Sequence, residues 1–328
     1  MPQETTHRAT HVKALIVLGV CLALLGGIGA WLLFGRDANA PCNGLPEDER
    51  VRKSVGAAVH PGMSCEALGE AIVKASVGDS PGRHTEAQAQ ALKDVLLALQ
   101  SGESKGLTLD PALRAPLATA LADYALDLHA MLGGNGSIEY VTQAAPHVPP
   151  WESGGTHHLA VFTNTLRDVL RAVAQDPHGY ALLRMTETRS AAQRLAPVPV
   201  DATGYALTVP PTEIARAMGT LDGIADAVTH GKDEGQTQAW RTAVLDTLLN
   251  GQASPESDQD PRTAHLTAAW LQTLKNASEE ERFDRLRTQG VDMVRTWAQE
   301  RKMDEQTWQR LLTEVESSAL SAYREIKP

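Results

Sequence analysis

Apolar residues follow two different patterns along the chain. Residues 14–34 form an unbroken apolar run, whereas further along apolar residues recur every three to four positions, as at Leu113, Leu117 and Leu121. The second pattern is typical of amphipathic helices that bury one face. It predicts an all-α fold with helices over residues 47–59, 64–76, 85–101, 111–132, 157–175, 177–195, 212–230, 236–250, 261–276, 279–301 and 304–326.

Several of these helices have recognisable start signals. Asp110, Asp176 and Asp260 each stand directly before a proline, so a capping carboxylate precedes a proline in the first helical turn. A Gln or Glu three residues after Thr85 and after Ser278 gives the spacing of a capping box. These signals make the helix starts better defined than the helix ends.

Two stretches interrupt the helical spacing. Residues 198–209 contain a turn-like Asp-Ala-Thr-Gly sequence and alternating apolar residues, which favour one short β-hairpin. Gly and Pro are concentrated in residues 133–156, which we interpret as a linker. The linker would join a membrane-proximal helical subdomain, residues 35–132, to a distal helical domain, residues 157–328.

The apolar run at residues 14–34 contains no charged side chain. At a rise of about 1.5 Å per residue, a helix of this length covers the bilayer's hydrocarbon core of about 30 Å. Arg8 and Lys13 precede the run, and the charges immediately after it cancel. The positive-inside rule therefore predicts a cytoplasmic tail, residues 1–13, one transmembrane helix and an extracytoplasmic remainder in the cell envelope.

Two other ways of processing this segment remain open. Ala38-Asn39-Ala40 resembles a signal-peptidase site, but Pro41 would follow the scissile bond and the run exceeds a usual signal-peptide core of about 7–15 residues. Residues 18–21 resemble a bacterial lipobox, although the bulky Val20 precedes the cysteine. We interpret the segment as an uncleaved membrane anchor.

Small residues and cysteines add two expectations. Gly19, Ala23 and Gly27 recur every fourth residue, a spacing that lets two membrane helices pack closely and predicts a homodimer in the bilayer. Cys42 and Cys65 are the cysteines outside the predicted span. A predicted helix and turn between them double the chain back, which predicts a disulfide of the kind found in oxidising compartments. Two free thiols in a reducing cytosol are the alternative and would reverse the topology.

Composition narrows the classes of partner. The net charge of −10 argues against nucleic acid as a ligand. Aromatic residues make up only 4% of the chain, and abundant Leu and Ala favour helix over sheet. Arg outnumbers Lys, and with frequent Ala and Gly this bias resembles proteins of high-GC actinobacteria.

One motif points toward catalysis. Residues 151–158 read WESGGTHH, and their Glu-Ser-Gly-Gly part resembles the catalytic-glutamate region of lysozyme-like cell-wall transglycosylases and resuscitation-promoting factors. The resemblance implies Glu152 as a general acid that protonates a glycosidic oxygen. In that family the glutamate ends a helix, whereas here Pro149 and Pro150 stand just before the motif and argue against one.

No motif predicts a metal or another cofactor. His157 and His158 are adjacent, so on a helix their side chains would point about 100° apart and would not form a metal-binding pair.

Residues 166–183 resemble uncharacterised helical regions of actinobacterial membrane-anchored, surface and toxin-type proteins. We therefore expect an envelope scaffold or interaction protein with unidentified envelope partners. A glycan-cleaving enzyme that uses Glu152 and a toxin-type effector are the alternatives.

Overall fold

The structure is a computed structural model that describes residues 42–80, 82–100, 106–134, 138–250 and 260–326. Within these ranges the chain forms fourteen α-helices, one short 3-10 helix and one two-stranded sheet, so the expected all-α class is confirmed. Among the helices so described, none combines the length and the apolar composition that crossing a membrane requires. The predicted span at residues 14–34 lies outside the described residues.

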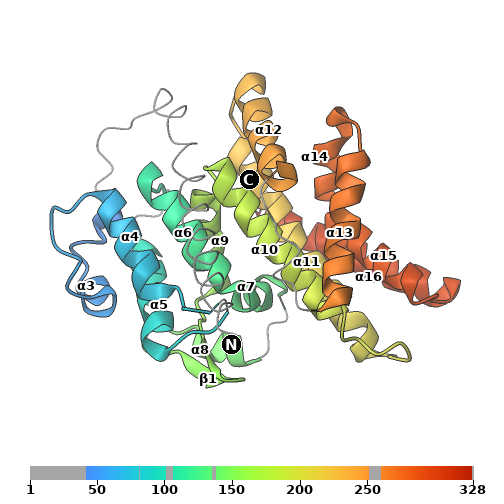
Figure 1. The fold of residues 1–328 in the computed structure, drawn as a ribbon, viewed down its shortest axis with the longest axis horizontal. Helices are drawn as coiled ribbons and strands as arrows, with labels where there is room; N and C mark the ends of the chain where they lie inside the picture. Colours follow the sequence, from blue (N-terminus) through green and yellow to red (C-terminus); the bar gives the residue numbers. More distant parts are fainter. Residues whose placement is uncertain (1–41, 81, 101–105, 135–137, 251–259, 327–328) are drawn as a thin grey trace, which may run out of the picture. The chain divides into compact units, whose positions relative to one another are not determined.

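The elements follow one another through mostly short connections (Figure 1). Their bounds are η1 (Cys42–Gly44), α3 (Glu49–Val55), α4 (Cys65–Ser76), α5 (Glu86–Gln100), α6 (Pro111–Asp123), α7 (Ala125–Leu132), α8 (Ile138–Gln143), β1 (Trp151–Ser153), β2 (Thr156–His158), α9 (Thr163–Val173), α10 (Pro177–Leu195), α11 (Tyr205–Thr229), α12 (Glu234–Asn250), α13 (Pro261–Asn276), α14 (Glu279–Arg287), α15 (Gln289–Glu300) and α16 (Glu305–Ile326).

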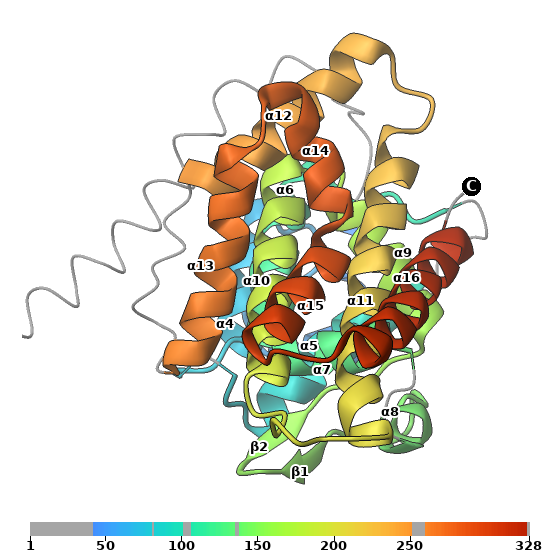
Figure 2. The same cartoon turned by 90° about the vertical axis from the view of Figure 1, so that its right-hand side faces the viewer.

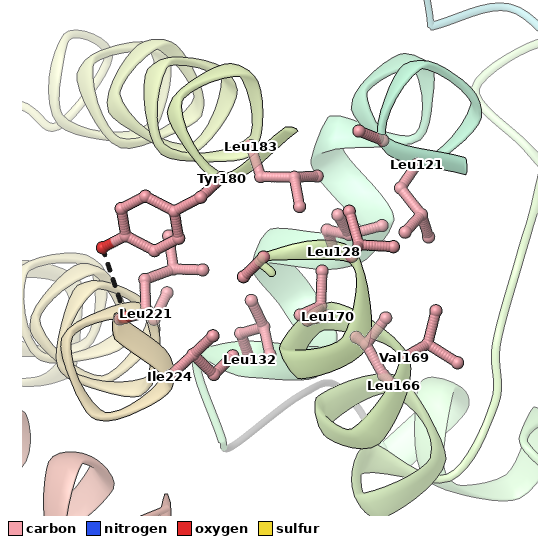
Figure 3. Close-up of a cluster of buried hydrophobic side chains, with 14 of the residues drawn as sticks. Leu121, Leu128, Leu132, Leu166, Val169, Leu170, Tyr180, Leu183, Leu221 and Ile224 are labelled. Atoms are coloured by element: carbon pink, nitrogen blue, oxygen red, sulfur yellow. Dashed lines mark hydrogen bonds between the residues drawn. The ribbon is translucent and has the colours of Figure 1, made fainter. Parts of the chain in front are cut away.

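Helix α10 is the central element of the bundle. It packs against α6, α7 and α9 on the N-terminal side of the chain and against α11, α12, α13 and α15 on the C-terminal side (Figures 1 and 2). Figure 3 shows part of the core that results, where Leu128, Leu170, Leu183 and Leu221 meet from four helices. Burial around most of its circumference makes α10 the helix on which the others assemble.

The core of α10 also carries a buried ionic group. Arg184 is fully buried, and its guanidinium donates to Asp222 Oδ1 at 2.6 Å and to Gln289 Oε1 at 2.6 Å. Burial raises the pKa of Asp222 to about 6 even though Arg184 favours the charged carboxylate. Because a buried guanidinium is costly unless its donors are satisfied, these bonds fix α10, α11 and α15 in one arrangement.

Helices α11 and α16 pack unusually closely, and Figure 2 shows them crossing. A Cβ atom added at Gly219 would lie 2.2 Å from the Ala319 carbonyl oxygen, and one added at Gly223 would lie 2.7 Å from Ile326 Cβ. The two glycines are four residues apart and therefore lie on one face of α11. Their missing side chains provide the space into which α16 fits.

The predicted division at residues 133–156 does not separate two cores. Residues 41–328 form one compact unit, and α5 and α6 from before this segment pack against α9 and α10 from after it. The segment itself contains α8 and β1. Its described Gly and Pro residues therefore lie in connections within one domain.

The predicted hairpin at residues 198–209 is wrong. Residues from Tyr205 onward form the start of α11, and the hairpin lies instead at Trp151–Ser153 and Thr156–His158. The alternating Tyr205, Leu207 and Val209 do not mark a half-buried strand, because only Leu207 is buried. At the true hairpin Gly154 and Gly155 have φ values of 61° and 78°, the left-handed pair that a two-residue type I′ turn requires.

The local capping signals predict where helices begin more accurately than the apolar spacing predicts how long they are. The carboxylates of Asp110, Asp176 and Asp260 each accept backbone N–H groups of their own helix, as predicted. Ser278 precedes α14, but its side chain makes no capping bond. The predicted helix over 111–132 divides at Tyr124, whose ψ of 37° ends α6 and starts α7.

Candidate functional site

A buried carboxylate on α7, that of Asp127, holds the motif at residues 151–158 against the domain. Asp127 is 3% exposed. Its Oδ1 accepts from the Tyr140 hydroxyl at 2.6 Å and lies 2.6 Å from His158 Nδ1, while its Oδ2 accepts the Leu159 N–H at 2.8 Å. A single side chain thus holds α8, β2 and the chain after β2 against α7.

Aromatic packing completes this group, which we call the Asp127 cluster (Asp127, Tyr140, Trp151 and His158). The Trp151 and His158 rings are stacked with centroids 5.2 Å apart, and Tyr140 meets Trp151 edge-on at 4.9 Å. The hairpin register pairs Trp151 with His158, so the two-residue turn places both rings on the same face of the sheet.

The geometry favours a charged imidazole at His158. Nδ1 faces Asp127, and Nε2 lies 3.2 Å from the Ser153 carbonyl oxygen, so both ring nitrogens face acceptors. The hydrogen bond to Asp127 raises the pKa of His158, with burial acting in the opposite direction. Burial and the adjacent Asp127 charge raise the pKa of Tyr140, which keeps its hydroxyl a donor at neutral pH.

This arrangement is suited to holding the chain together and poorly suited to proton transfer. A general base needs a ring nitrogen with a free lone pair directed at a substrate, and both nitrogens of His158 are engaged within the protein. Among the described residues, no three His, Cys, Asp or Glu side chains are placed to bind a metal ion. The cluster is therefore a polar anchor for the motif.

Glu152, the residue implied by the transglycosylase resemblance, is exposed on β1 opposite His157. A general acid in that chemistry needs a desolvated site that favours its protonated form, and an exposed strand supplies none. The glutamate also lies on a hairpin, whereas the family glutamate ends a helix. Both features weaken the enzymatic interpretation.

A second His–Asp pair lies next to β2. His84 Nε2 is 2.8 Å from Asp123 Oδ2, and the His84 ring stacks on Tyr124 with centroids 3.6 Å apart. The His84 backbone bonds the hairpin twice, because its N–H donates to Thr156 Oγ1 at 2.8 Å and its carbonyl accepts the His157 N–H at 2.9 Å. The α6–α7 corner thus supplies the carboxylates of both pairs, Asp123 at the end of α6 and Asp127 on α7.

Lys93 on α5 anchors the connection between α8 and the hairpin. Its side chain is buried, and Nζ donates to the Gln143 carbonyl at 2.8 Å and to the Val148 carbonyl at 2.7 Å. Burial lowers the pKa of Lys93 to about 8, an effect that the neighbouring Asp94 partly offsets. Sequence reasoning missed both Lys93 and Asp127, since each lies on a regular helix with partners many residues away.

The remaining predicted site residues have clear outcomes. Cys42 and Cys65 form the predicted disulfide, with Cα atoms 5.3 Å apart. The side chain of Asn43 bonds the Thr108 carbonyl and the Asp110 N–H, so the start of the described chain is tied down twice. The predicted membrane-packing residues Gly19, Ala23 and Gly27 lie outside the described residues.

A buried pair in the core offers no room for a substrate. His129 Nδ1 lies 2.6 Å from Glu187 Oε1, and both side chains are almost fully buried. The neighbouring cavity, lined by Glu187 and by leucines of α7, α9, α10 and α11, measures about 10 Å³. A space of this size holds about one water molecule.

Comparison with protein-family models, with curated proteins and with solved structures gives no match for the chain. The resemblances of residues 151–155 and 166–183 therefore remain predictions from the sequence. What the Asp127 cluster contributes to function has to be argued from its own geometry.

Proposed function

We propose that the chain is a single-pass membrane protein whose residues 42–328 act outside the cytoplasm as an interaction or scaffold domain of the bacterial envelope. The main support is the outer face of α8. Ile138 and Val141 are 82% and 69% exposed and lie three residues apart on one side of the helix. Two exposed apolar side chains on one face of a helix are candidate contacts for a protein partner.

The disulfide supports the compartment in this proposal. Disulfides persist in oxidising environments and are rare in the cytosol of mesophiles. The Cys42–Cys65 bond lies immediately after the predicted membrane segment. A membrane helix with a cytoplasmic N-terminus would deliver both cysteines to the oxidising side.

The proposal can be tested by chemical cross-linking and pull-down of the full chain from native membranes. We expect envelope proteins to be captured by the wild type and lost from an Ile138→Asp, Val141→Asp double variant. Leu320→Asp is the matched control, because Leu320 is an exposed apolar residue on a different helix, α16. Equal capture by all three proteins would contradict the role of α8.

The two alternative functions predict different results. A cell-wall hydrolase would clear peptidoglycan in a zymogram and lose that activity on Glu152→Gln, whereas a scaffold would clear none. A toxin-type effector would harm cells when its extracytoplasmic part is expressed alone. The exposed position of Glu152 favours the scaffold over the hydrolase.

Dimerisation in the bilayer forms a separate part of the proposal. The four-residue spacing of Gly19, Ala23 and Gly27 supports close contact between two membrane helices. A Gly19→Leu, Gly27→Leu double variant should abolish cross-linked dimers of the full chain in membranes. Dimers that persist in this variant would exclude this face as the contact.

A further inference from the structure

The 138–158 segment, which comprises α8, the following loop and the hairpin, is attached to the domain mainly through polar contacts. Within it only Ala144 and Pro150 are buried. The segment is held through Asp127, through Lys93 and through the backbone of His84. With so little apolar burial, its docking depends on hydrogen bonds whose strength changes with protonation.

His158 is the contact most sensitive to protonation. Around its ring lie Asp127 of α7, Tyr140 and Glu139 of α8, and the Ser153 carbonyl of the hairpin turn. Arg194 of α10 lies within electrostatic reach of the same cluster through Tyr140. Asp127, the Ser153 carbonyl and Glu139 each favour the protonated form of the ring.

We propose that protonation of His158 controls docking of the 138–158 segment on α7, so that the segment is docked when His158 is charged and opens when it is neutral. Loss of the proton converts the ion pair with Asp127 into a hydrogen bond from a neutral imidazole to the carboxylate, and it turns the Nε2 lone pair toward the Ser153 carbonyl oxygen. The carboxylate keeps a donor, but the Coulombic attraction between the imidazolium and Asp127 is lost.

The other contacts determine where the segment opens. A neutral lysine still has two N–H groups, enough for the Gln143 and Val148 carbonyls, so Lys93 keeps its bonds when it loses its proton. The two bonds to the His84 backbone involve no titrating atom. Opening therefore begins where Tyr140 and His158 meet Asp127, with Lys93 and His84 as the fixed points.

The direction of the pH dependence follows from the raised pKa of His158. A histidine whose folded pKa exceeds its ordinary value near 6.5 stabilises the docked form fully below that value. The stabilisation is lost as pH rises through the folded pKa. This inference rests on contacts within the chain and does not depend on the proposed scaffold function.

Hydrogen exchange of the full chain in detergent, measured by mass spectrometry at pH 6, 7, 8 and 9, tests the proposal. After correction for the intrinsic exchange rate, we expect protection of peptides from residues 138–158 to fall about tenfold across this range, the size expected for one charge-assisted bond. Peptides from α10 should keep their protection. Unchanged protection of 138–158 across the range would overturn the proposal.

Two histidine variants separate His158 from its neighbour. In His158→Gln the side chain does not titrate, so protection of 138–158 should no longer depend on pH. His157→Gln is the matched control, since the His157 side chain lies beside it on β2 and contributes only its backbone N–H. A His158→Gln protein that keeps the wild-type pH dependence would overturn the proposal.

A direct titration covers the case in which His158→Gln fails to fold. The His158 ring signal of the wild type, followed by NMR, should titrate with a midpoint above 6.5 that coincides with the opening measured by hydrogen exchange. Midpoints that differ by more than one pH unit would show that another group controls the segment.

Discussion

At the scale of single residues, side chains that act on their nearest neighbours could be predicted and side chains that act across the fold could not. Asp110, Asp176 and Asp260 cap helices whose first turn follows directly in sequence. A few consecutive residues are therefore enough to predict their role. Asp127 lies on a helix, and its partners are 13 to 32 residues further along the chain. No local pattern identifies such a residue.

Gly219 gives a residue-scale prediction. We expect Gly219→Ala to destabilise the protein by about 1–3 kcal/mol, because the added Cβ would lie 2.2 Å from the backbone oxygen of Ala319 and must push α16 away from α11. The measurement is the urea midpoint of the full chain in detergent. Gly235→Ala is the control, since its Cβ would meet only the flexible Asp233 side chain and the helical position favours alanine. Equal midpoints for the two variants would contradict the close packing.

At the scale of elements, the apolar spacing located the helices and failed where a turn changed their direction. The predicted ranges 177–195 and 261–276 coincide with α10 and α13, whose starts carry an aspartate cap and a proline. The alternating residues at 198–209 wrongly predict a hairpin there, whereas the Gly-Gly pair at 154–155 is the stronger signal for a two-residue turn.

The loop before α5 depends on the ionised carboxylate of Asp123. Burial alone would raise its pKa, but the hydrogen bonds from His84 and from the Gly78 N–H lower it below the ordinary value. An acid with a lowered folded pKa stabilises the protein above its ordinary pKa near 3.8, and this contribution is lost as pH falls through the folded value. We expect the stability difference between wild type and Asp123→Asn, measured with urea, to be largest near pH 5 and to shrink toward pH 2. A constant difference would contradict this role.

Lys93 on α5 predicts a stability that also rises with pH, but in the alkaline range. Its folded pKa of about 8 lies below the ordinary value of 10.5, so between these values the unfolded chain binds a proton that the folded chain does not. The stability of the wild type should therefore rise with pH across this interval relative to Lys93→Met. Urea unfolding at pH 7.5 and pH 10 measures the change. Lys74→Met, which removes an exposed lysine from α4, should show no such slope relative to the wild type.

At the scale of the whole molecule, the abundance of Leu and Ala correctly indicates a helical chain. The Gly and Pro content of residues 133–156, in contrast, predicts a division into two domains that the fold does not show. Residues 133–156 look like a linker because turns and linkers share the same residue types. The distinction lies in contacts such as Lys93 with Gln143, which join segments 50 residues apart and leave no trace in local sequence. Because α10 packs against helices from both sides of this segment, the domain has one core.

The Cys42–Cys65 disulfide ties the first described residue to the start of α4. The bond closes a loop over a sequence separation of 23 residues, and the chain-entropy model gives about 3 kcal/mol of stabilisation for a loop of this size. We expect a Cys42→Ser, Cys65→Ser double variant to lower the free energy of unfolding by about this amount. Cys21→Ser is the control, because Cys21 lies inside the predicted span and should not affect unfolding of the domain.

The same cysteines test the proposed topology in native membranes. Peptide mapping without reducing agent should recover the two cysteines in one linked peptide, since the proposed orientation places both in an oxidising compartment. Cysteines that alkylate freely would contradict both the bond and the extracytoplasmic location. A mature chain that starts at Pro41 would show instead that the apolar run is removed as a signal peptide. An intact chain with the bond formed would leave the domain tethered by residues 35–41, which at about 3.5 Å per residue span at most about 25 Å.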